Sequence, residues 1–413
     1  MKTVFVHDHR FVRIGSDIFS PGKYSYSLFA DRYLPYFGDI TIVARGQTLQ
    51  NSETQFSLVS GVGVSFIEFP SLSNPKALLF PQSYYSLADA ILAEVDCVIV
   101  RLPSEIGNLF ADRARSLKIP LMVEVVACPW DGLRSVGSIQ AKAYAPLAYS
   151  RMKRQLRLAQ ASTYVTSKFL QLRYPSKEKM VGISDVEIPD PSNVVLTKKI
   201  QRFEKSQKHL TPLRLGFIGG IENRTKGVSD GIKALSLLAK QLNKVTFDIV
   251  GPGDQTLYKT LARSLGVESM VRFRGPIGTR DEILSFLDDE IDIYIHPSYM
   301  EGLPRAAVEA MSRACPIVAS TAGGIPELVD LHWLHAPGDY NDLANKIFTL
   351  WNDKKLLVQQ AKLNFNRSLD FRKETLEEKR KSFISDFFIN HGLKFNGEKL
   401  WSKVGVGAKQ SRN

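Results

Sequence analysis

The sequence is poor in cysteine and has no long hydrophobic run. Its 413 residues include only Cys97, Cys128 and Cys315, too few and too scattered for a disulfide framework or a metal site, so we expect a reducing compartment. No apolar stretch approaches the roughly 18 residues of a membrane-spanning helix. The first residues, MKTVFVHDHRF, meet charge after a few apolar positions, unlike a secretory signal peptide. We therefore expect a cytoplasmic or peripheral protein.

Strict nucleotide-binding and nucleic-acid motifs are lacking as well. The glycine-rich segment GGIENRTKG at 219–227 has neither the spacing of a Walker loop nor that of a complete dinucleotide fingerprint. No aromatic–basic signature accompanies the net charge of +12, so we expect no nucleic-acid partner.

The composition is that of an ordinary globular protein. Hydrophobic residues make up 44% and charged residues 23% of the chain, which excludes a disordered, collagenous or coiled-coil protein. At roughly 100–200 residues per domain, the length predicts two or three domains, each with a core of its own.

The excess positive charge is concentrated in two segments. Residues 140–180 hold nine basic residues and one acidic residue, and the chain from Phe371 to its end holds ten basic and five acidic ones. The rest of the chain is nearly neutral. The charge therefore calls for a partner at two places only, and not over the whole surface.

The first basic segment contains a predicted amphipathic helix. In residues 139–160, IQAKAYAPLAYSRMKRQLRLAQ, apolar and basic side chains recur at helical spacing. Arg151, Lys153, Arg154 and Arg157 would then form a surface for anionic lipid heads or phosphates. An ordinary surface helix that covers the core fits the pattern equally well, and both interpretations remain open.

Short apolar runs alternate with amphipathic stretches in both halves of the chain. The predicted strands are 3–6, 40–43, 64–66, 97–100, 121–126, 162–165, 213–218, 246–250, 271–274, 291–295 and 317–319. The predicted helices are 24–34, 86–93, 106–116, 231–241, 255–265, 280–287 and 304–313. This alternation predicts βαβ units, mostly parallel sheets and an α/β fold.

A polar stretch bounded by prolines, 189–212, interrupts the alternation. We place a linker at 191–212, between an N-terminal domain at 1–190 and a C-terminal domain at 213–370, both doubly wound and Rossmann-like. The basic tail, 391–413, is expected to be flexible.

The loops after the C-terminal strands are where a ligand is expected, because parallel sheets bind ligands at the carboxyl ends of their strands. In the first of these loops, Gly219 and Gly220 allow close approach of a ligand to the backbone. Arg224 and Lys226 add positive charge just before a helix, which suits a phosphate group. Glycines placed there for purely steric reasons explain the same loop.

The stretch 296–329, HPSYMEGLPRAAVEAMSRACPIVASTAGGIPELV, contains two glutamates eight positions apart. Glu301 lies in a loop, and Glu309 lies inside a helix that begins near Pro304. Backbone N–H groups at Gly302 and Leu303 could hold an oxyanion. Because apolar residues flank Glu309, its carboxylate should have a partner, such as the hydroxyl groups of a ribose or hexose.

This stretch resembles the Glu-x7-Glu signature of the family 4 retaining glycosyltransferases. The blocks GFIGG…KG, DIVGPGD and VRFRGPI extend the resemblance densely over 213–330 and loosely over the remaining chain. The blocks HDHRF, YSYSLFADRYL, RLPSEIG, VEVVACPWD and YVTSKFLQLRYPS resemble bacterial capsular and exopolysaccharide-assembly members. The resemblance implies a GT-B fold, in which two Rossmann-like domains face a cleft. We expect the helix at about 371–390 to pack back on the N-terminal domain.

The resemblance also implies a nucleotide-diphosphate sugar on the C-terminal domain. Lys226 and Arg224 would contact the diphosphate, and Glu309 the ribose. Glu301, with the backbone of Gly302 and Leu303, would hold the donor sugar. The other implied donor-binding residues are Gly22, Gly219, Gly220, Gly251, Gly253, Arg274 and Ile277, of which Arg274–Ile277 would lie against the base.

The implied activity is transfer of a sugar to a glycan or lipid-linked saccharide in bacterial surface polysaccharide biosynthesis, at the inner face of the plasma membrane. No cofactor and no metal are expected, because cations do the work of a metal in this family. Asp288, Asp289 and Asp292 superficially suggest a metal site. They fall at a helix end and a strand start, so we interpret them as structural.

The sequence departs from the family pattern in its C-terminal half at two places. Gly220 stands where many members have Arg, so we transfer that role to Arg224. Ala314 and Cys315 precede Pro316, where the family has a Cys-Gly-x-Pro sequence.

A third departure concerns the reacting centre. Several members have a histidine there in the N-terminal domain, whereas His7 and His9, at the end of the first strand, are the only N-terminal histidines here. Asp131, in the loop after 121–126, is the candidate for contacting the acceptor or the reacting hydroxyl, beside Glu301 as the other catalytic candidate. A turn residue in Cys-Pro-Trp-Asp-Gly explains Asp131 equally well.

Two other functions are compatible with the fold. A nucleotide-sugar epimerase would act without an acceptor, which distinguishes it from a transferase. A non-catalytic carbohydrate or membrane scaffold would not need Lys226, Glu301 and Glu309.

Overall fold

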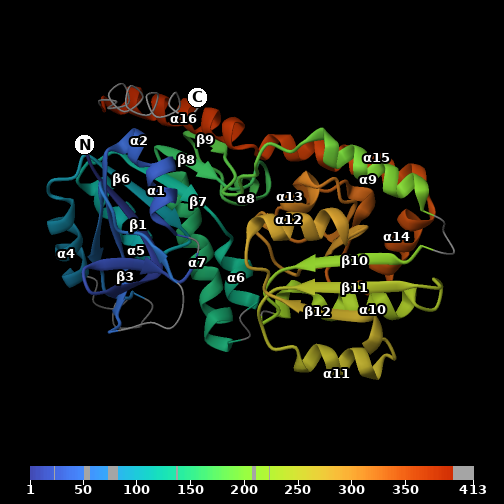
Figure 1. Ribbon diagram of the computed structural model, residues 1–413. Coiled ribbons are helices and arrows are strands. Elements are labelled where there is room, and N and C mark those ends of the chain that lie inside the picture. Colours follow the sequence, from blue (N-terminus) through green and yellow to red (C-terminus); the bar gives the residue numbers. More distant parts are fainter. Residues whose placement is uncertain are drawn as a thin grey trace. The chain divides into compact units, whose positions relative to one another are not determined.

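The computed structural model describes residues 1–22, 24–50, 56–72, 82–135, 138–206, 211–222 and 224–393. The chain divides into two compact units (Figure 1). The N-terminal unit comprises Met1–Ile183 and the chain from Glu377 onward, and the C-terminal unit comprises Ser184–Leu376. Each unit contains a sheet of mainly parallel strands with helices on both faces, which confirms the predicted α/β, doubly wound fold class.

The sheet of the N-terminal unit is organised around one long strand. Its strands are β1 (Lys2–Ile14), β2 (Asp17–Ser20), β3 (Asp39–Thr48), β4 (Ser57–Leu58), β5 (Val64–Glu68), β6 (Cys97–Leu102), β7 (Leu121–Val125), β8 (Ala161–Tyr164) and β9 (Lys179–Gly182). β1 pairs in parallel with β3 and β6, and its second half turns back as an antiparallel hairpin with β2. β7, β8 and β9 extend the parallel sheet from β6.

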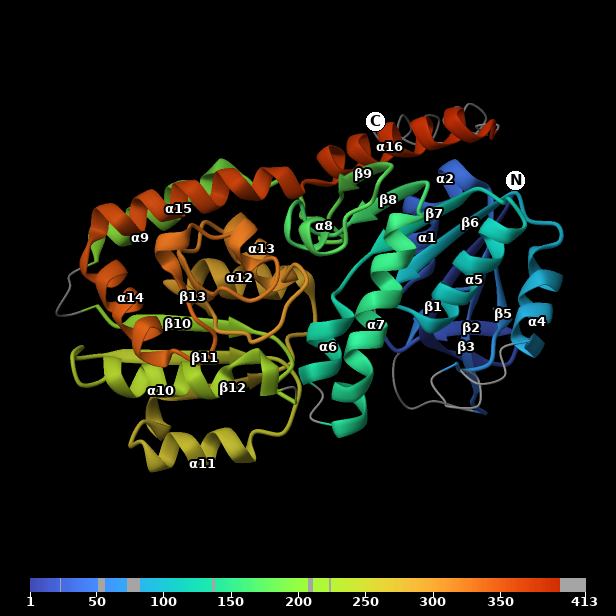
Figure 2. The same cartoon turned by 180° about the vertical axis from the view of Figure 1, so that it is seen from behind.

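Helices cover both faces of this sheet (Figures 1 and 2). They are α1 (Tyr26–Arg32), α2 (Leu34–Phe37), α4 (Gln82–Leu92), α5 (Glu105–Ser116), α6 (Pro129–Ser135), α7 (Ile139–Arg157), α8 (Phe169–Arg173) and α16 (Lys373–His391). α4, α5 and α7 lie on the face that Figure 2 shows in front. On the other face, Phe5 packs edge-on against Phe29 of α1, and Phe37 of α2 packs against Phe388 of α16.

The sheet of the C-terminal unit is wholly parallel. Its strands are β10 (Leu213–Ile218), β11 (Val245–Val250), β12 (Val271–Gly275), β13 (Ile293–His296), β14 (Ile317–Ser320) and β15 (Leu334–His335). They are ordered β12-β11-β10-β13-β14-β15. The direction of winding therefore changes beside β10 and β13, the position where ligands bind in such sheets.

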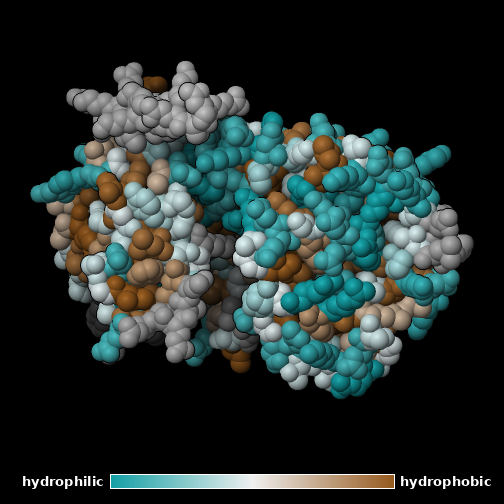
Figure 3. Space-filling model, in the orientation of Figure 1, coloured by the Kyte–Doolittle hydropathy of each residue, from teal (hydrophilic) through white to brown (hydrophobic). Residues whose placement is uncertain are grey.

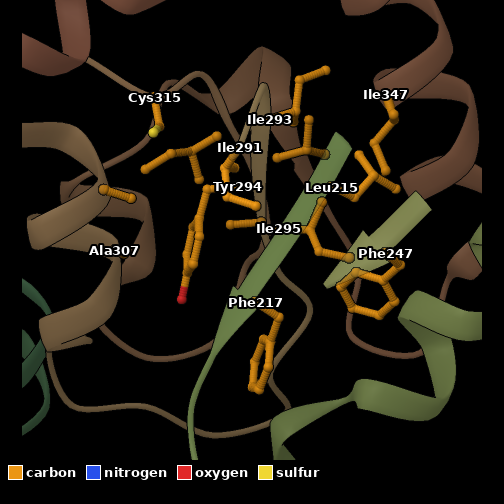
Figure 4. Packing of buried hydrophobic residues seen from close by; sticks show 14 of the residues in the cluster. Leu215, Phe217, Phe247, Ile291, Ile293, Tyr294, Ile295, Ala307, Cys315 and Ile347 are labelled. Atoms are coloured by element: carbon orange, nitrogen blue, oxygen red, sulfur yellow. The ribbon is translucent and has the colours of Figure 1, made fainter. Parts of the chain in front are cut away.

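The helices of the C-terminal unit also form two layers. They are α9 (Asn193–Lys205), α10 (Val228–Leu238), α11 (Thr256–Ser264), α12 (Arg280–Asp289), α13 (Arg305–Ser312), α14 (Tyr340–Asn352) and α15 (Lys354–Ser368), with one-turn 3-10 helices at Arg224–Lys226, Glu268–Met270, Ile325–Glu327, Leu331–Trp333 and Leu369–Phe371. In Figure 4, Phe247 and Ile347 lie on one side of the strands, whereas Tyr294 points towards the α13 side, where Ala307 lies. These residues belong to one buried apolar core.

The end of β1 and the predicted linker are two of the stretches that differ from the predicted elements. β1 continues eight residues beyond the predicted strand end at Val6 because Arg10–Arg13 pair with β3 and with the hairpin strand β2. The stretch predicted as a linker contains α9. Lys199 anchors this helix, since its Nζ donates to the carbonyl oxygens of Leu287, Asp288 and Ile291 at 2.7–3.0 Å. Nearly all of the predicted flexible tail, 394–413, lies outside the described residues.

The surface differs in character between the units. In the view of Figure 3, the C-terminal unit is largely hydrophilic, whereas more hydrophobic residues reach the surface on the N-terminal unit. Among the helices that the structure describes, none has the length and the apolar content that crossing a membrane requires.

Candidate active site

Three loops of the C-terminal unit meet at the carboxyl ends of β10 and β13. The loop after β13 passes between Gly227, which begins α10, and Gly323, which follows β14. Both glycines have positive φ, and a Cβ would lie 2.0 Å from the carbonyl oxygen of Pro297 at Gly227 and 1.9 Å from that of Glu301 at Gly323. Only glycine fits at these two contacts, so the loop that carries Glu301 is fixed from both sides.

Glu301 lies at the centre of a polar cluster. Its Oε1 accepts hydrogen bonds from Lys226 Nζ at 2.7 Å, from His296 Nε2 at 2.9 Å and from Ser298 Oγ at 2.8 Å. The glutamate side chain is 9% exposed and that of Lys226 is 28% exposed. Lys226 and Glu301, two of the predicted site residues, thus form a largely buried ion pair.

The cluster keeps Glu301 ionised. Burial by itself raises the pKa of a carboxyl group, but the hydrogen bonds and charges of His296 and Lys226 lower the pKa of Glu301 to about 2. Because a carboxylate only accepts hydrogen bonds, Nε2 of His296 carries a proton. On the other side of the ring, Nδ1 lies 3.1 Å from the hydroxyl of Tyr294.

Glu309 is buried in α13 and lacks such partners. It is 5% exposed, and its carboxylate has no hydrogen bond to any residue that the structure describes. Burial raises the pKa of Glu309, and the positive charges of Arg305 and Arg280 offset part of that rise. A buried carboxylate without a donor is costly in free energy, so Glu309 is suited to accept hydrogen bonds from a ligand.

Backbone donors complete this part of the site. α13 begins directly after Pro304, with no side chain capping its first turn. Within the described part of the chain, the N–H groups of Gly302 and Leu303 have no acceptor. They and the helix N-terminus give the loop a positive end next to the carboxylate of Glu301.

The loop after β10 lies against the loop after β11. The N–H of Gly219 donates to the carbonyl of Val250, and the N–H of Ile221 donates to that of Pro252, both at 2.9 Å. Gly251 and Gly253 lie in the second loop, where Gly253 contacts Glu222. Gly220 and the exposed Arg224 lie in the first loop, so the predicted phosphate-binding residues do share one region.

Arg274 has another role in addition to any contact with a base. Its guanidinium group pairs with Asp248 at 2.7 Å and with Glu290 at 2.6 Å, which raises its pKa. Ile277 packs, partly buried, against the apolar core. Because these ion pairs engage the side chain of Arg274, we expect a contact between this segment and a base to come from the backbone after β12.

In the N-terminal unit, Gly22 lies in the loop between β2 and α1. Its N–H donates to Oγ of Ser20, which is 2.9 Å from Nε2 of His9. Burial and the charge of Arg45 lower the pKa of His9 to about 4, so its ring is neutral near pH 7. His7 accepts the N–H of His9 at Nδ1. The two histidines and Gly22 thus form one local structure.

Asp131 lies in the first turn of α6 and not in an open turn. Its carboxylate pairs with Arg173 of α8 at 2.5 Å. The neighbouring Cys128 thiol lies 3.0 Å from the hydroxyl of Tyr174. Asp131 therefore links α6 to α8, a structural role that the sequence did not reveal.

Arginines contact all three aspartates that superficially suggest a metal site, two of them through the carboxylate. Asp288 pairs with Arg313, and the buried Asp292 pairs with Arg202 and Arg214. Asp289 accepts hydrogen bonds from Arg202 and Arg214 at its backbone carbonyl. Across the described residues, no group of three or more His, Cys, Asp or Glu side chains is arranged to bind a metal ion.

The predicted basic helix is α7, but its cations are not equivalent. Arg151 pairs with Glu105 at 2.7 Å and Arg154 with Asp112 at 3.2 Å. Lys153 is exposed and lies over the ring of Tyr149, and Arg157 is exposed. Apolar side chains of the same stretch are exposed as well: Ile139, Leu147 and Leu158 are 84%, 49% and 48% exposed.

Sequence reasoning did not identify His296, Ser298 and Tyr294 as part of the site. A usable signal was present, because His296 ends a buried strand five positions before Glu301 and Ser298 lies between them. The alternation of β13 places Tyr294 and His296 on the same face of the sheet, where their rings lie 5.9 Å apart.

Comparison with known proteins gives a consistent result. Residues 212–353 match the family described as glycosyl transferases group 1. Protein CapJ from Staphylococcus aureus is 28% identical over 406 residues, which cover 96% of this chain and all of CapJ. The amylovoran biosynthesis glycosyltransferase AmsK from Erwinia amylovora is 32% identical over 178 residues, covering 39% of this chain and 43% of AmsK.

Solved structures share the fold at lower identity. The crystal structure of HepE from Anabaena in complex with UDP superposes with a TM-score of 0.63 and 19% identity, covering 94% of this chain and all of that one. A second HepE structure contains UDP-glucose.

Proposed function

We propose that this chain, which belongs to the group 1 glycosyltransferases and has the GT-B fold, is a retaining, metal-independent hexosyltransferase that uses a nucleotide-diphosphate sugar. The acceptor in this proposal is a glycan or lipid-linked saccharide in bacterial surface polysaccharide biosynthesis. Full-length similarity to CapJ and partial similarity to the amylovoran enzyme AmsK support that setting.

One observation carries the proposal. Lys226, Glu301 and the N–H groups of Gly302 and Leu303 converge where the loops after β10 and β13 meet. A cation, a carboxylate and free backbone donors match the diphosphate and the hydroxyl groups of a nucleotide sugar. The HepE structures with UDP and UDP-glucose support this assignment by fold alone.

Each predicted donor residue has a role in this proposal. Lys226 and Arg224 neutralise the diphosphate, and the loops with Gly219, Gly220, Gly251 and Gly253 let backbone approach it. Glu309 accepts hydrogen bonds from the ribose hydroxyls, and Glu301 accepts a hydrogen bond from a sugar hydroxyl at its other oxygen, Oε2. Gly22, and the backbone at Arg274 and Ile277, are assigned to the phosphates and the base as implied by the resemblance.

The chemistry needs electrostatics more than a nucleophile. The bond between the anomeric carbon and the diphosphate oxygen breaks, and its electron pair stays on that oxygen. The anomeric carbon bonds to the acceptor oxygen, whose proton passes to the departing phosphate. Lys226, Arg224 and the start of α13 stabilise the developing negative charge. Such stabilisation is usually the largest single effect that lowers the barrier of a reaction of this kind. Asp131 remains the candidate for the acceptor side.

The acceptor surface is assigned to α7. This helix exposes cations, among them Lys153 and Arg157, and the same stretch also exposes Ile139, Leu147 and Leu158. A helix that exposes both cations and apolar side chains suits an anionic membrane surface, so we place the protein at the inner face of the plasma membrane.

The test is a screen of nucleotide sugars by thermal shift, followed by transfer assays. A donor that binds only the folded protein raises its melting temperature. We expect at least one nucleotide sugar to do so, and to be consumed only when a saccharide acceptor is added. Consumption without an acceptor would indicate epimerisation or hydrolysis, and no stabilisation by any nucleotide sugar would contradict the proposal.

A further inference from the structure

Lys226, the cation proposed to bind the diphosphate, forms an ion pair with Glu301 in this structure. Lys226 Nζ lies 2.7 Å from Oε1 of Glu301. A diphosphate oxygen at Lys226 would therefore stand within a few ångströms of a carboxylate. Both groups are anionic, so they compete for one ammonium group.

We infer that Glu301 makes the donor site select the intact nucleotide sugar over the free nucleoside diphosphate, by competing for Lys226. This inference rests on the proposed function. In the intact donor, a neutral sugar with hydroxyl groups stands between the carboxylate and the diphosphate. In the free nucleoside diphosphate, the terminal phosphate has an additional ionisable oxygen and faces Glu301 directly.

Glu301 cannot withdraw from this contact. Two other donors, His296 Nε2 and Ser298 Oγ, hold the same oxygen, Oε1. The backbone of Glu301 lies against Gly323, and Tyr299 in the same loop donates its N–H to Thr225 at 2.7 Å. Lys226 has a long side chain and is the more exposed partner, so the lysine moves towards the phosphate and the carboxylate stays.

The sugar offsets the competition. When Lys226 turns towards the diphosphate, Oε1 keeps two donors, and a sugar hydroxyl can donate to Oε2. Without the sugar, Oε2 faces a phosphate oxygen across partly buried space, where repulsion between charges is weakly screened. Glu301 is thus a specificity-determining residue, and it favours departure of the nucleoside diphosphate once the sugar has been transferred.

The experiment compares Glu301→Gln with the wild-type chain. Glutamine keeps the shape and an acceptor oxygen for the neighbouring donors but removes the charge. Dissociation constants are measured by calorimetry for UDP, GDP, ADP and dTDP, for inorganic pyrophosphate, and for the corresponding nucleotide sugars. Glu268→Gln is the matched control, because it removes the carboxylate of an ion pair with Arg263 on the surface of the same unit.

We expect Glu301→Gln to bind the preferred nucleoside diphosphate and pyrophosphate about three- to tenfold more tightly, the size of effect that one partly exposed ion pair has. Its affinity for the nucleotide sugar should fall or stay unchanged, so the preference for the nucleotide sugar over the diphosphate should decrease by at least about threefold. Ser298→Ala, which keeps the carboxylate charge, should not tighten diphosphate binding. Thermal unfolding without ligand shows that each variant is folded.

The outcomes separate the two proposals. If the wild-type protein binds a nucleotide sugar but Glu301→Gln binds the diphosphate no more tightly than Glu268→Gln does, the inference is wrong and the proposed function stands. If the wild-type protein binds neither nucleotide sugars nor diphosphates, the proposed function falls, and the inference falls with it.

Discussion

The two units use their charged side chains differently at the carboxyl ends of their sheets. In the C-terminal unit, Glu309 and the N–H groups of Gly302 and Leu303 have no partner among the described residues. In the N-terminal unit, Asp8 caps α5 through the N–H groups of Glu105 and Ile106, and Asp131 pairs with Arg173.

The comparison separates groups ready for a ligand from groups already used in the fold. In the C-terminal unit, Glu309 and the N–H groups of Gly302 and Leu303 can bind a hydroxyl-rich anion as they stand, and only Lys226 has to exchange its ion pair with Glu301 for the ligand. The N-terminal unit would have to give up internal pairs to do so, at a free-energy cost for every buried charge left alone. The comparison therefore supports the proposal that the C-terminal unit recognises the donor, and its variants should show the larger effects.

The largest effect is expected for Lys226→Ala and Glu309→Ala. Each should lower the rate of sugar transfer by about 10²–10³-fold or more, because a lost electrostatic contact to the leaving group or the ribose is not replaced by water. Steady-state transfer assays measure this, and circular dichroism checks the fold. Lys244→Ala, an exposed lysine of the same unit, is the matched control. Near-normal turnover in either variant would refute the donor assignment.

An intermediate effect is expected on α7. Replacing Lys142, Lys153 and Arg157 together by glutamine should weaken binding to vesicles that contain anionic lipid by roughly 100-fold, at about 1 kcal/mol per cation. These three are preferable to Arg151 and Arg154, whose pairs with Glu105 and Asp112 join α7 to α5.

The matched control for α7 is a triple variant elsewhere, Lys240, Lys244 and Lys259 to glutamine, assayed by co-sedimentation in low salt. If the α7 variant binds the vesicles as well as this control does, α7 is an ordinary surface helix.

The smallest effect is expected for Asp131→Asn. Loss of the ion pair with Arg173 should lower the free energy of unfolding by about 1 kcal/mol and change transfer less than tenfold. Chemical denaturation and transfer assays measure the two quantities. Glu94→Gln, which breaks the exposed pair with Lys2, should change stability less. A loss of transfer comparable to that of Lys226→Ala would instead place Asp131 at the reacting centre and weaken the contrast between the units.

Local sequence patterns predicted much of the C-terminal unit. The bounds of β10, Leu213–Ile218, were predicted without error, because an apolar run ends at a glycine pair. Lys226 and Glu301 are 75 positions apart in the sequence, yet both lie in segments that connect a parallel strand to the next helix, and the topology brings them together.

Other features depend on distant partners, and local patterns could not reveal them. β1 continues through the polar stretch HDHR, which gives no strand signal. It does so because the second half of the strand pairs with β3 and β2. α9 reads as a linker because it is mostly polar, and its position depends on Lys199 reaching carbonyl groups 88–92 positions away. The pair of Asp131 with Arg173 likewise joins two helices 42 positions apart.

The chain leaves the N-terminal unit after Ile183 and re-enters it at Glu377. The C-terminal unit is thus an insertion, and it could be excised as one uninterrupted polypeptide, whereas its host could not. Shortening the protein from its C-terminal end into α16 would remove Phe388 and then Asp386, which contact Phe37 and Lys179. A deletion series would therefore damage the N-terminal unit before it reached the proposed donor site, and loss of activity in such truncations would not test that site.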